Sequence, residues 1–231
     1  MKVTKPSSGW LNDWPHWLII GGMFAASAIA WDRVTPPIPI HWGIRGQPDG
    51  FGGRFEGLLL IPLIAIGLYV LLLALPRFDP ARANYASFSG PYRLMRLVLT
   101  ALLGIVHALM VASALGASVD VGRWAPFTVG VTFAILGNVL GKVRPNYFVG
   151  IRTPWTLASA RSWERTHRVG GRVFVAAGIA MAVAGLAAIP PLTVAVFIAD
   201  GIAILGLVVY SYLAWRADPE RVPVTGTTPA P

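Results

Sequence analysis

The sequence predicts an all-α membrane protein, a bundle of about six transmembrane helices with both termini in the cytoplasm. Three observations support this fold class. The chain has 231 residues, of which 55% are hydrophobic and only 13% are charged, whereas a soluble domain carries about a quarter charged residues. Six apolar stretches reach or approach the length of about 20 residues that a membrane-crossing helix needs. Finally, if each stretch crosses the membrane once, most Lys and Arg residues lie in the loops on one side of it.

The six stretches must be helical, because lipid offers no hydrogen-bonding partner to an exposed backbone. They cover residues 14–31, 57–75, 94–117, 124–141, 173–189 and 192–215. Only Pro190 and Pro191 separate the last two stretches, which predicts a tight helical hairpin. We expect a two-helix unit over residues 14–75, a four-helix unit over residues 76–215, and a disordered tail over residues 216–231, which is rich in Pro and Thr.

The loops on the two sides differ strongly in basic residues. With six passes, the loops on the side of the termini hold 15 Lys and Arg residues, with Arg96 counted among them, and the opposite loops hold 4. Since basic residues collect on the cytoplasmic side of a membrane protein, both termini are expected in the cytoplasm. The net charge of +9 is then a signal of topology, and direct binding of nucleic acid is not expected.

Small residues recur on two of the predicted helices. Ala176, Ala180, Ala184 and Ala188 follow one another at every fourth position, and Gly137 and Gly141 show the same spacing. Such stripes let helices approach closely. They predict packing within the bundle, with a contact between two copies in a homo-oligomer as the alternative.

The outer loop, residues 36–54, combines prolines with an apolar-aromatic segment and a strong turn signal. We expect it to fold back onto the outer membrane surface, with Trp42 and Phe51 at the interface. His41 and Asp49 could share a proton or a ligand, or they could only stabilise the turn. The candidate residues of this outer, ligand-facing loop are His41, Trp42, Gly43, Pro48, Asp49 and Gly50.

The cytoplasmic loop, residues 142–172, interleaves seven basic residues with aromatic ones. Thr156 is a plausible N-cap for a helix that carries Trp163 and His167 and that Gly170-Gly171 interrupts. An in-plane amphipathic helix on anionic lipid would explain the charges and the aromatics. It would not explain the Pro145-Asn146 turn, which leaves a specific binding role open.

Two segments resemble a known family. The cytoplasmic loop resembles the signature of the SdpI family of bacterial membrane proteins, and the outer loop resembles an uncharacterised domain often found N-terminal to it. The residues that carry the first resemblance are Arg144, Asn146, Gly150, Arg152, Thr153, Pro154, Trp155, Thr156, Trp163, Thr166, His167, Arg168, Gly170 and Gly171. Those that carry the second are His41-Trp42-Gly43 and Pro48-Asp49-Gly50.

The resemblance implies a location and partners. The family's namesake is an immunity protein that protects a bacterium from its own secreted killing factor, and it also signals by holding a soluble repressor at the membrane. This implies a multi-pass protein of the bacterial cytoplasmic (inner) membrane, in contact with the lipid bilayer, with a toxin peptide outside and a soluble repressor inside. The chain departs from the family at residues 159–162, Ser-Ala-Arg-Ser, where relatives carry acidic residues.

Two ionisable residues, His107 and Asp200, lie within predicted spans, where such side chains are costly and usually functional. Both lie roughly 12–15 Å from the outer surface at 1.5 Å per residue, so they could face each other. Such a pair would make a small transporter or channel the alternative function. A His that is simply hydrogen-bonded inside the bundle is the other interpretation.

No catalytic residues stand out, and we do not expect an enzyme. The four histidines show no metal-ligand spacing, and no nucleophile or phosphate-binding motif is present. The chain has no cysteine, which excludes disulfides and thiolate ligands. We therefore expect no metal and no cofactor.

Overall fold

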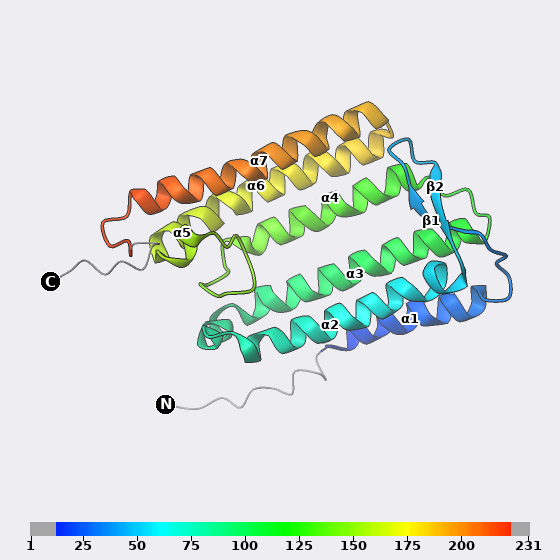
Figure 1. Cartoon of the computed structure of the whole chain (residues 1–231), viewed down its shortest axis with the longest axis horizontal. Coiled ribbons are helices and arrows are strands. Elements are labelled where there is room, and N and C mark those ends of the chain that lie inside the picture. The colour runs from blue at the N-terminus through cyan, green and yellow to red at the C-terminus, as the bar shows by residue number, and fades with distance from the viewer. Residues whose placement is uncertain (1–12, 223–231) are drawn as a thin grey trace.

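The computed structural model describes residues 13–222 and is a bundle of helices with one β-hairpin at an end (Figure 1). The regular elements, in chain order, are α1 (Trp14–Ala30), β1 (Ile38–Trp42), β2 (Pro48–Gly52), the π-helical turn η2 (Phe55–Leu59), α2 (Leu60–Phe78), the 3-10 segment η3 (Arg82–Phe88), α3 (Ser89–Ala114), α4 (Val121–Leu140), α5 (Pro154–Leu157), α6 (Ala160–Ala187) and α7 (Pro190–Arg216). The antiparallel hairpin β1–β2 is an addition to the predicted all-α fold.

All six predicted apolar stretches fall mainly within long helices, namely α1, α2, α3, α4, α6 and α7. Within residues 13–222, four helical segments are long and apolar enough to cross a membrane: Phe55–Phe78, Arg82–Ala114, Ala160–Ala187 and Pro190–Arg216. The helix α1 is apolar but shorter, with 17 residues. The fold is thus that of a multi-pass helical membrane protein.

The long helices run side by side, so the bundle has two distinct ends (Figure 1). The hairpin β1–β2, the α3–α4 loop and the α6–α7 turn share one end, here called the hairpin end. The loop after α4, the helix α5 and the 3-10 segment η3 share the other, here called the signature end. The described chain begins and ends toward the signature end.

The closest helix pair is α4 with α6, and glycine residues make this approach possible. They lie seven residues apart, at Gly130 and Gly137 on α4 and at Gly171, Gly178 and Gly185 on α6. A Cβ atom at Gly137 would lie 2.7 Å from the carbonyl oxygen of Gly171, and one at Gly171 would lie 2.8 Å from that of Gly137. Because a real Cβ essentially never comes so near backbone, glycine is needed at this crossing.

The predicted alanine stripe does not make that contact. Ala176 and Ala188 are exposed, and only Ala184 of the four is buried. Ala188 lies outside α6 as its left-handed C-cap. The prediction chose the wrong small residues because alanines at every fourth position wind round to a different face from the glycines.

A buried ion pair joins the first three long helices. Arg96 Nη2 lies 2.9 and 3.0 Å from the two carboxylate oxygens of Asp13, and the Tyr69 hydroxyl donates to the same carboxylate at 3.0 Å. Asp13 is fully buried and Arg96 is 6% exposed. The topology count treated Arg96 as a loop charge, whereas the structure places it inside the bundle.

The predicted tail falls partly outside the described chain. Residues 223–231 are not described, and Arg216 still belongs to α7. The residues 217–222 fold back onto the bundle, since the Val222 amide donates to the Ala158 carbonyl at 3.4 Å and Trp215 Nε1 donates to the Val222 carbonyl at 3.2 Å. This part of the predicted disordered tail is ordered.

Candidate functional site

The outer motif forms the hairpin, and the spacing of its residues has a geometric reason. His41 pairs with Gly50 across the strands, and its Nδ1 lies 2.5 Å from Asp49 Oδ1. A Cβ atom at Gly50 would lie 2.8 Å from His41 Cβ, and one at Gly43 would lie 2.6 Å from Asp49 Oδ2. The two glycines therefore make room for the His41–Asp49 pair, whose side chains are 72% and 52% exposed.

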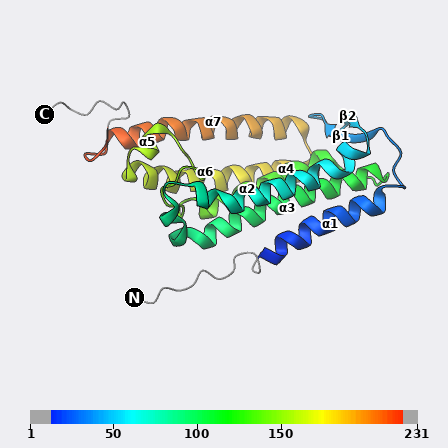
Figure 2. The ribbon, with the colours of Figure 1, turned by 60° about the horizontal axis from the view of Figure 1, so that its bottom comes forward.

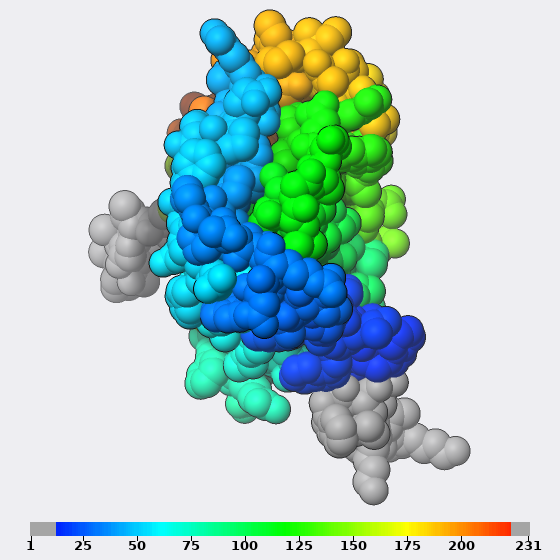
Figure 3. Space-filling model, turned by 90° about the vertical axis from the view of Figure 1, so that its right-hand side faces the viewer, coloured from blue at the N-terminus to red at the C-terminus, as the bar shows by residue number. Residues whose placement is uncertain are grey.

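The tip of the hairpin rests on the first turn of α4. Gly46 has a left-handed φ of +72°, and a Cβ atom there would lie 3.0 Å from the Cα atom of Gly122. Asp120 caps α4 by accepting from the Arg123 amide at 3.0 Å. This contact of two glycines holds the hairpin tip against the start of α4. Figure 3 shows this end of the bundle, with the hairpin on it, facing the viewer.

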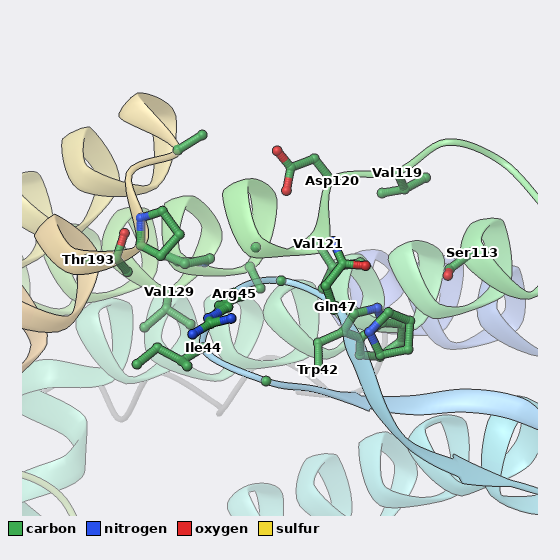
Figure 4. A pocket seen from close by; sticks show the side chains of 18 of the residues that line it. Trp42, Ile44, Arg45, Gln47, Ser113, Val119, Asp120, Val121, Val129 and Thr193 are labelled. Atoms are coloured by element: carbon green, nitrogen blue, oxygen red, sulfur yellow. The ribbon is translucent and has the colours of Figure 1, made fainter.

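A cavity of about 900 Å³, here called the hairpin cavity, lies beneath the hairpin tip. The hairpin, the α3–α4 loop, the start of α4 and the α6–α7 turn all contribute to its wall (Figure 4). Its apolar lining includes Trp42, Ile44, Val121, Ala125, Pro126, Val129, Met181, Val194 and Phe197, and its polar lining includes Arg45, Gln47, Ser113, Asp120 and Thr193.

The predicted outer residues divide between two roles. Trp42, Gly43 and Pro48 line the cavity. His41 and Asp49 stabilise the hairpin by their cross-strand pair and do not line the cavity. Phe51 is 54% exposed, as expected for a residue at an interface.

At the signature end, Asn146 organises the loop after α4. Its Oδ1 accepts from the Phe148 and Val149 amides at 3.0 and 2.6 Å, and its Nδ2 donates to the Arg144 and Val149 carbonyls at 2.9 Å each. The side chain is only 1% exposed. An amide group that serves two acceptors and two donors has its full hydrogen-bonding capacity in use, so Asn146 has a structural role.

Asp79, which sequence reasoning missed, ties this loop to the end of α2. Its Oδ2 accepts from the Tyr85 hydroxyl at 2.9 Å and from the Tyr147 amide at 3.0 Å. Its Oδ1 accepts from the Ala81 amide at 2.7 Å. The residue is 2% exposed. Little in the sequence points to this residue, because an Asp before a proline at the end of a helix is typical of an ordinary turn.

His167 closes the loop from the opposite side. Its Nε2 accepts from the Ile151 amide at 3.0 Å, and its Nδ1 lies 2.8 Å from the Trp163 carbonyl. Since an amide can only donate and a carbonyl can only accept, the ring is neutral with its proton on Nδ1. Gly150 has φ +110°, and a Cβ atom there would collide with His167 Nε2.

The helix caps in this segment differ from the prediction. Thr153, rather than Thr156, is the N-cap, and the two form a capping box at the start of α5. Ser159 caps α6 by accepting from the Ser162 amide at 2.8 Å. The Ser162 hydroxyl donates to the Ser211 carbonyl at 2.9 Å. Ser159 and Ser162 thus cap α6 and join it to α7.

The helix α6 is also continuous through Gly170 and Gly171, which corrects both the predicted interruption and the in-plane helix. Gly171 faces Gly137 of α4, and a Cβ atom at Gly170 would collide with the Ile151 side chain. The glycines therefore serve packing and not a break. Trp163 is 1% exposed and donates from Nε1 to the Val143 carbonyl at 2.9 Å.

Few signature residues remain available to a partner. Arg144, Arg152, Pro154 and Arg168 are exposed, and Trp155 is half-buried against Tyr212, with ring centroids 5.3 Å apart. Thr166 is fully buried, and its hydroxyl has no hydrogen-bond partner among the described residues. Most residues of the signature segment, 144–171, thus stabilise the fold, and the exposed ones form a basic surface.

His107 and Asp200 do not meet within the chain. His107 Nε2 lies 3.0 Å from the Ser27 hydroxyl and 3.2 Å from the Met23 carbonyl of α1. Asp200 Oδ2 is buried without a partner among the described residues. The predicted intramolecular pair is therefore wrong, because α3 and α7 lie apart in the bundle (Figure 1).

Together, the fold and the cavity define a multi-pass helical membrane protein with a cavity at one end. The described residues contain no group of three His, Cys, Asp or Glu that could hold a metal ion. Residues 142–211 match the SdpI/YfhL protein family, and residues 18–66 match a domain of unknown function, DUF1648. The chain is therefore similar to the SdpI/YfhL family over residues 142–211 and to DUF1648 over residues 18–66, nearer its N-terminus.

A curated relative agrees with this assignment. Immunity protein SdpI of Bacillus subtilis (strain 168) is 25% identical over 169 residues, which cover 72% of this chain and 77% of the relative. No solved structure matches the chain. The matches to the two family models include the hairpin region and most of the signature segment.

Proposed function

We propose that the chain is an immunity protein that captures a secreted, membrane-active peptide in the hairpin cavity, with the hairpin end facing outward. The cavity carries this proposal. Its volume of about 900 Å³ lies within the range of roughly 300–1,000 Å³ for ligand sites. It opens where the apolar helices end, so a peptide that approaches the bilayer from that side would meet it first.

The lining suits an amphipathic peptide. Val129 and Phe197 form apolar wall, while Arg45 and Asp120 supply charges of opposite sign. A peptide that is apolar on one face and polar on the other could satisfy both sets of contacts. Binding would withdraw the peptide from the bilayer without any chemical step, so protection needs no catalysis.

A survival assay tests this function. Sensitive bacteria would express the wild type, Ala125→Phe or Ala28→Phe and then be challenged with a panel of secreted membrane-active peptides. Ala125 lines the cavity, so phenylalanine there would fill part of it. Ala28 is exposed on α1 and lines neither this cavity nor the groove described below, which makes Ala28→Phe a matched control.

We expect selective survival with the wild type and Ala28→Phe and loss of survival with Ala125→Phe, at equal membrane levels. Equal killing of wild-type and empty cells by every peptide would reject the immunity function. Protection that persists in Ala125→Phe would instead reject the cavity as its site.

The exposed basic residues of the signature end favour a second contact, with a soluble acidic partner inside the cell, such as a repressor. Arg152 and Arg168 are exposed, and the ion pair between Arg144 and Glu164 is a loose one at 3.7 Å. Arg152→Ala with Arg168→Ala should reduce recruitment of such a partner to membranes and leave protection intact. Loss of protection in that variant would contradict a separate signalling surface.

A further inference from the structure

An apolar groove runs between α1 and α3 on the flank of the bundle. Its volume is about 290 Å³, and nearly all of its lining is apolar. Small residues dominate it, namely Gly22, Ala26, Ala101, Gly104 and Ala108, together with Ile19, Met23, Ile105 and His107. Pairs of small residues four apart, such as Gly22 with Ala26 and Gly104 with Ala108, are typical of sites where another helix packs closely.

His107 supplies this groove with an unused hydrogen-bond acceptor. The side chain is 1% exposed, and its Nε2 lies 3.2 Å from the Met23 carbonyl. A carbonyl can only accept, so Nε2 carries the proton and Nδ1 is a bare acceptor. Nδ1 is buried without a partner among the described residues. A buried acceptor left unmet is costly, so a donor from outside the chain that reaches Nδ1 when the side chains around it shift would be favoured.

The opposite flank carries the matching features on α7. Figures 1 and 2 show α1 and α7 on opposite sides of the bundle. In its most apolar window only 6% of α7 is buried, and Ala199 and Ala203 form an exposed stripe of small residues. Beside this stripe lies Asp200, half-buried, with its Oδ2 lacking any partner in the described chain.

We propose that α7 of one copy docks into the α1–α3 groove of a second copy, where the Asp200 carboxyl donates to His107 Nδ1. A carboxyl group in hydrocarbon is neutral, because an isolated charge there is costly, and a neutral carboxyl has one hydrogen to donate. Asp200 would thereby supply the hydrogen-bond donor that His107 Nδ1 lacks, and His107 the acceptor that the carboxyl hydrogen lacks.

Depth and direction agree with this pairing. His107 lies seven residues from the hairpin-end limit of α3 at Ala114, and Asp200 lies ten residues from the start of α7 at Pro190. At 1.5 Å per residue both are about 10–15 Å deep. Since α7 runs opposite to α1 and α3 (Figure 1), it would fit the groove antiparallel, with both copies in the same membrane orientation. The two contact surfaces differ, so the contact between copies is head-to-tail.

Disulfide cross-linking tests the contact directly, because the chain has no cysteine of its own. Copies with Gly22→Cys and copies with Ala199→Cys would be expressed together in membranes and oxidised. Gly21→Cys replaces Gly22→Cys in the control. Gly21 and Gly22 are both exposed and have open space around an added Cβ, but only Gly22 lines the groove.

We expect a cross-linked dimer with Gly22→Cys and at least several-fold less with Gly21→Cys. In the Gly22→Cys and Ala199→Cys pair, Asp200→Leu should remove the cross-link, whereas Asp200→Asn, which keeps a donor, should retain it. Equal cross-linking from positions 21 and 22, or no effect of Asp200→Leu, would overturn the proposal. A stronger cross-link between two Gly22→Cys copies would do the same, because it would show a symmetric contact.

Discussion

The two ends of the bundle use their motifs in opposite ways. At the signature end, Asn146, His167 and the Thr153–Thr156 box direct nearly all their polar atoms into the protein. At the hairpin end, the His41–Asp49 pair is exposed and the hairpin leaves a cavity of about 900 Å³ beneath it. The signature end, which has more motif residues, therefore uses them for hydrogen bonds within the protein. The hairpin end has fewer motif residues, and they surround a cavity that has room for a ligand.

The largest effect is expected at Gly150. Gly150→Ala would place a Cβ atom in the left-handed region and against His167. Backbone strain of about 1–2 kcal/mol and crowding of about 1–3 kcal/mol should together lower the free energy of unfolding severely. Size-exclusion profiles and thermal midpoints of the solubilised protein measure this. A thermal midpoint of Gly150→Ala equal to that of the wild type would contradict the close packing of residue 150 against His167.

A smaller but clear loss is expected at Asn146. Asn146→Ala removes five hydrogen bonds from a buried loop, one of them a long bond of 3.4 Å from the Tyr85 hydroxyl, at a cost of about 3 kcal/mol. Asn146→Asp keeps the three contacts in which the side-chain oxygen accepts and should fall between alanine and the wild type. The thermal midpoint again gives the ranking. Equal thermal midpoints of Asn146→Ala and Asn146→Asp would show that the hydrogen bonds accepted by the side-chain oxygen do not contribute to stability.

At the hairpin end, a change in the exposed ion pair should hardly affect folding. His41→Ala, Asp49→Ala and the double variant should each lose less than about 1 kcal/mol of stability, because exposed pairs contribute little. Protection against the peptide should nevertheless decrease, because the hairpin over the cavity becomes less ordered. Thermal midpoints and survival are measured on the same variants. A loss of stability as large as that of Asn146→Ala would contradict the claim that residues of the hairpin end contribute less to folding than those of the signature end.

The smallest effect concerns the contact between the start of α6 and the chain after α7. The Ser159 hydroxyl donates to Asp218 Oδ2 at 2.5 Å, and this contact lowers the pKa of the Asp218 carboxyl below its ordinary 3.8. The stabilisation is then complete above pH 3.8 and is lost as the pH falls through the lower, folded-state pKa. The thermal midpoint of Asp218→Asn should therefore lie below that of the wild type at pH 7, and the difference should shrink at pH 3.

Much of the fold could be predicted from the sequence because the bilayer imposes simple rules. Apolar length identified the helices. Pro48-Asp49-Gly50, which predicted a turn, instead belongs to the strand β2, and the hairpin turns at residues 43–47. The cavity was not predictable, since it depends on how residues from four distant segments meet. His41 and Asp49 were correctly brought together, but their neighbours Trp42, Gly43 and Pro48 are the ones that line the cavity.

Sequence reasoning failed where two polar residues far apart meet. Asp13 and Arg96 lie 83 positions apart, and each resembles an ordinary flanking charge. Ser211, in an apolar helix, gave a usable signal that was overlooked, and it is fully buried against Ser162 and Thr153. His107 and Asp200 were rightly singled out as costly, yet they belong to opposite flanks of the bundle.

The most direct test of the account is peptide binding to purified protein in lipid nanodiscs. The ligand is the peptide against which the wild type protects, and Trp42 in the cavity wall offers a fluorescence signal. We predict that Ala125→Phe weakens binding at least tenfold, whereas Ala28→Phe and Arg152→Ala bind as the wild type does. Unchanged binding by Ala125→Phe, or equal weakening by Arg152→Ala, would contradict the division of the molecule into a binding end and a folding end.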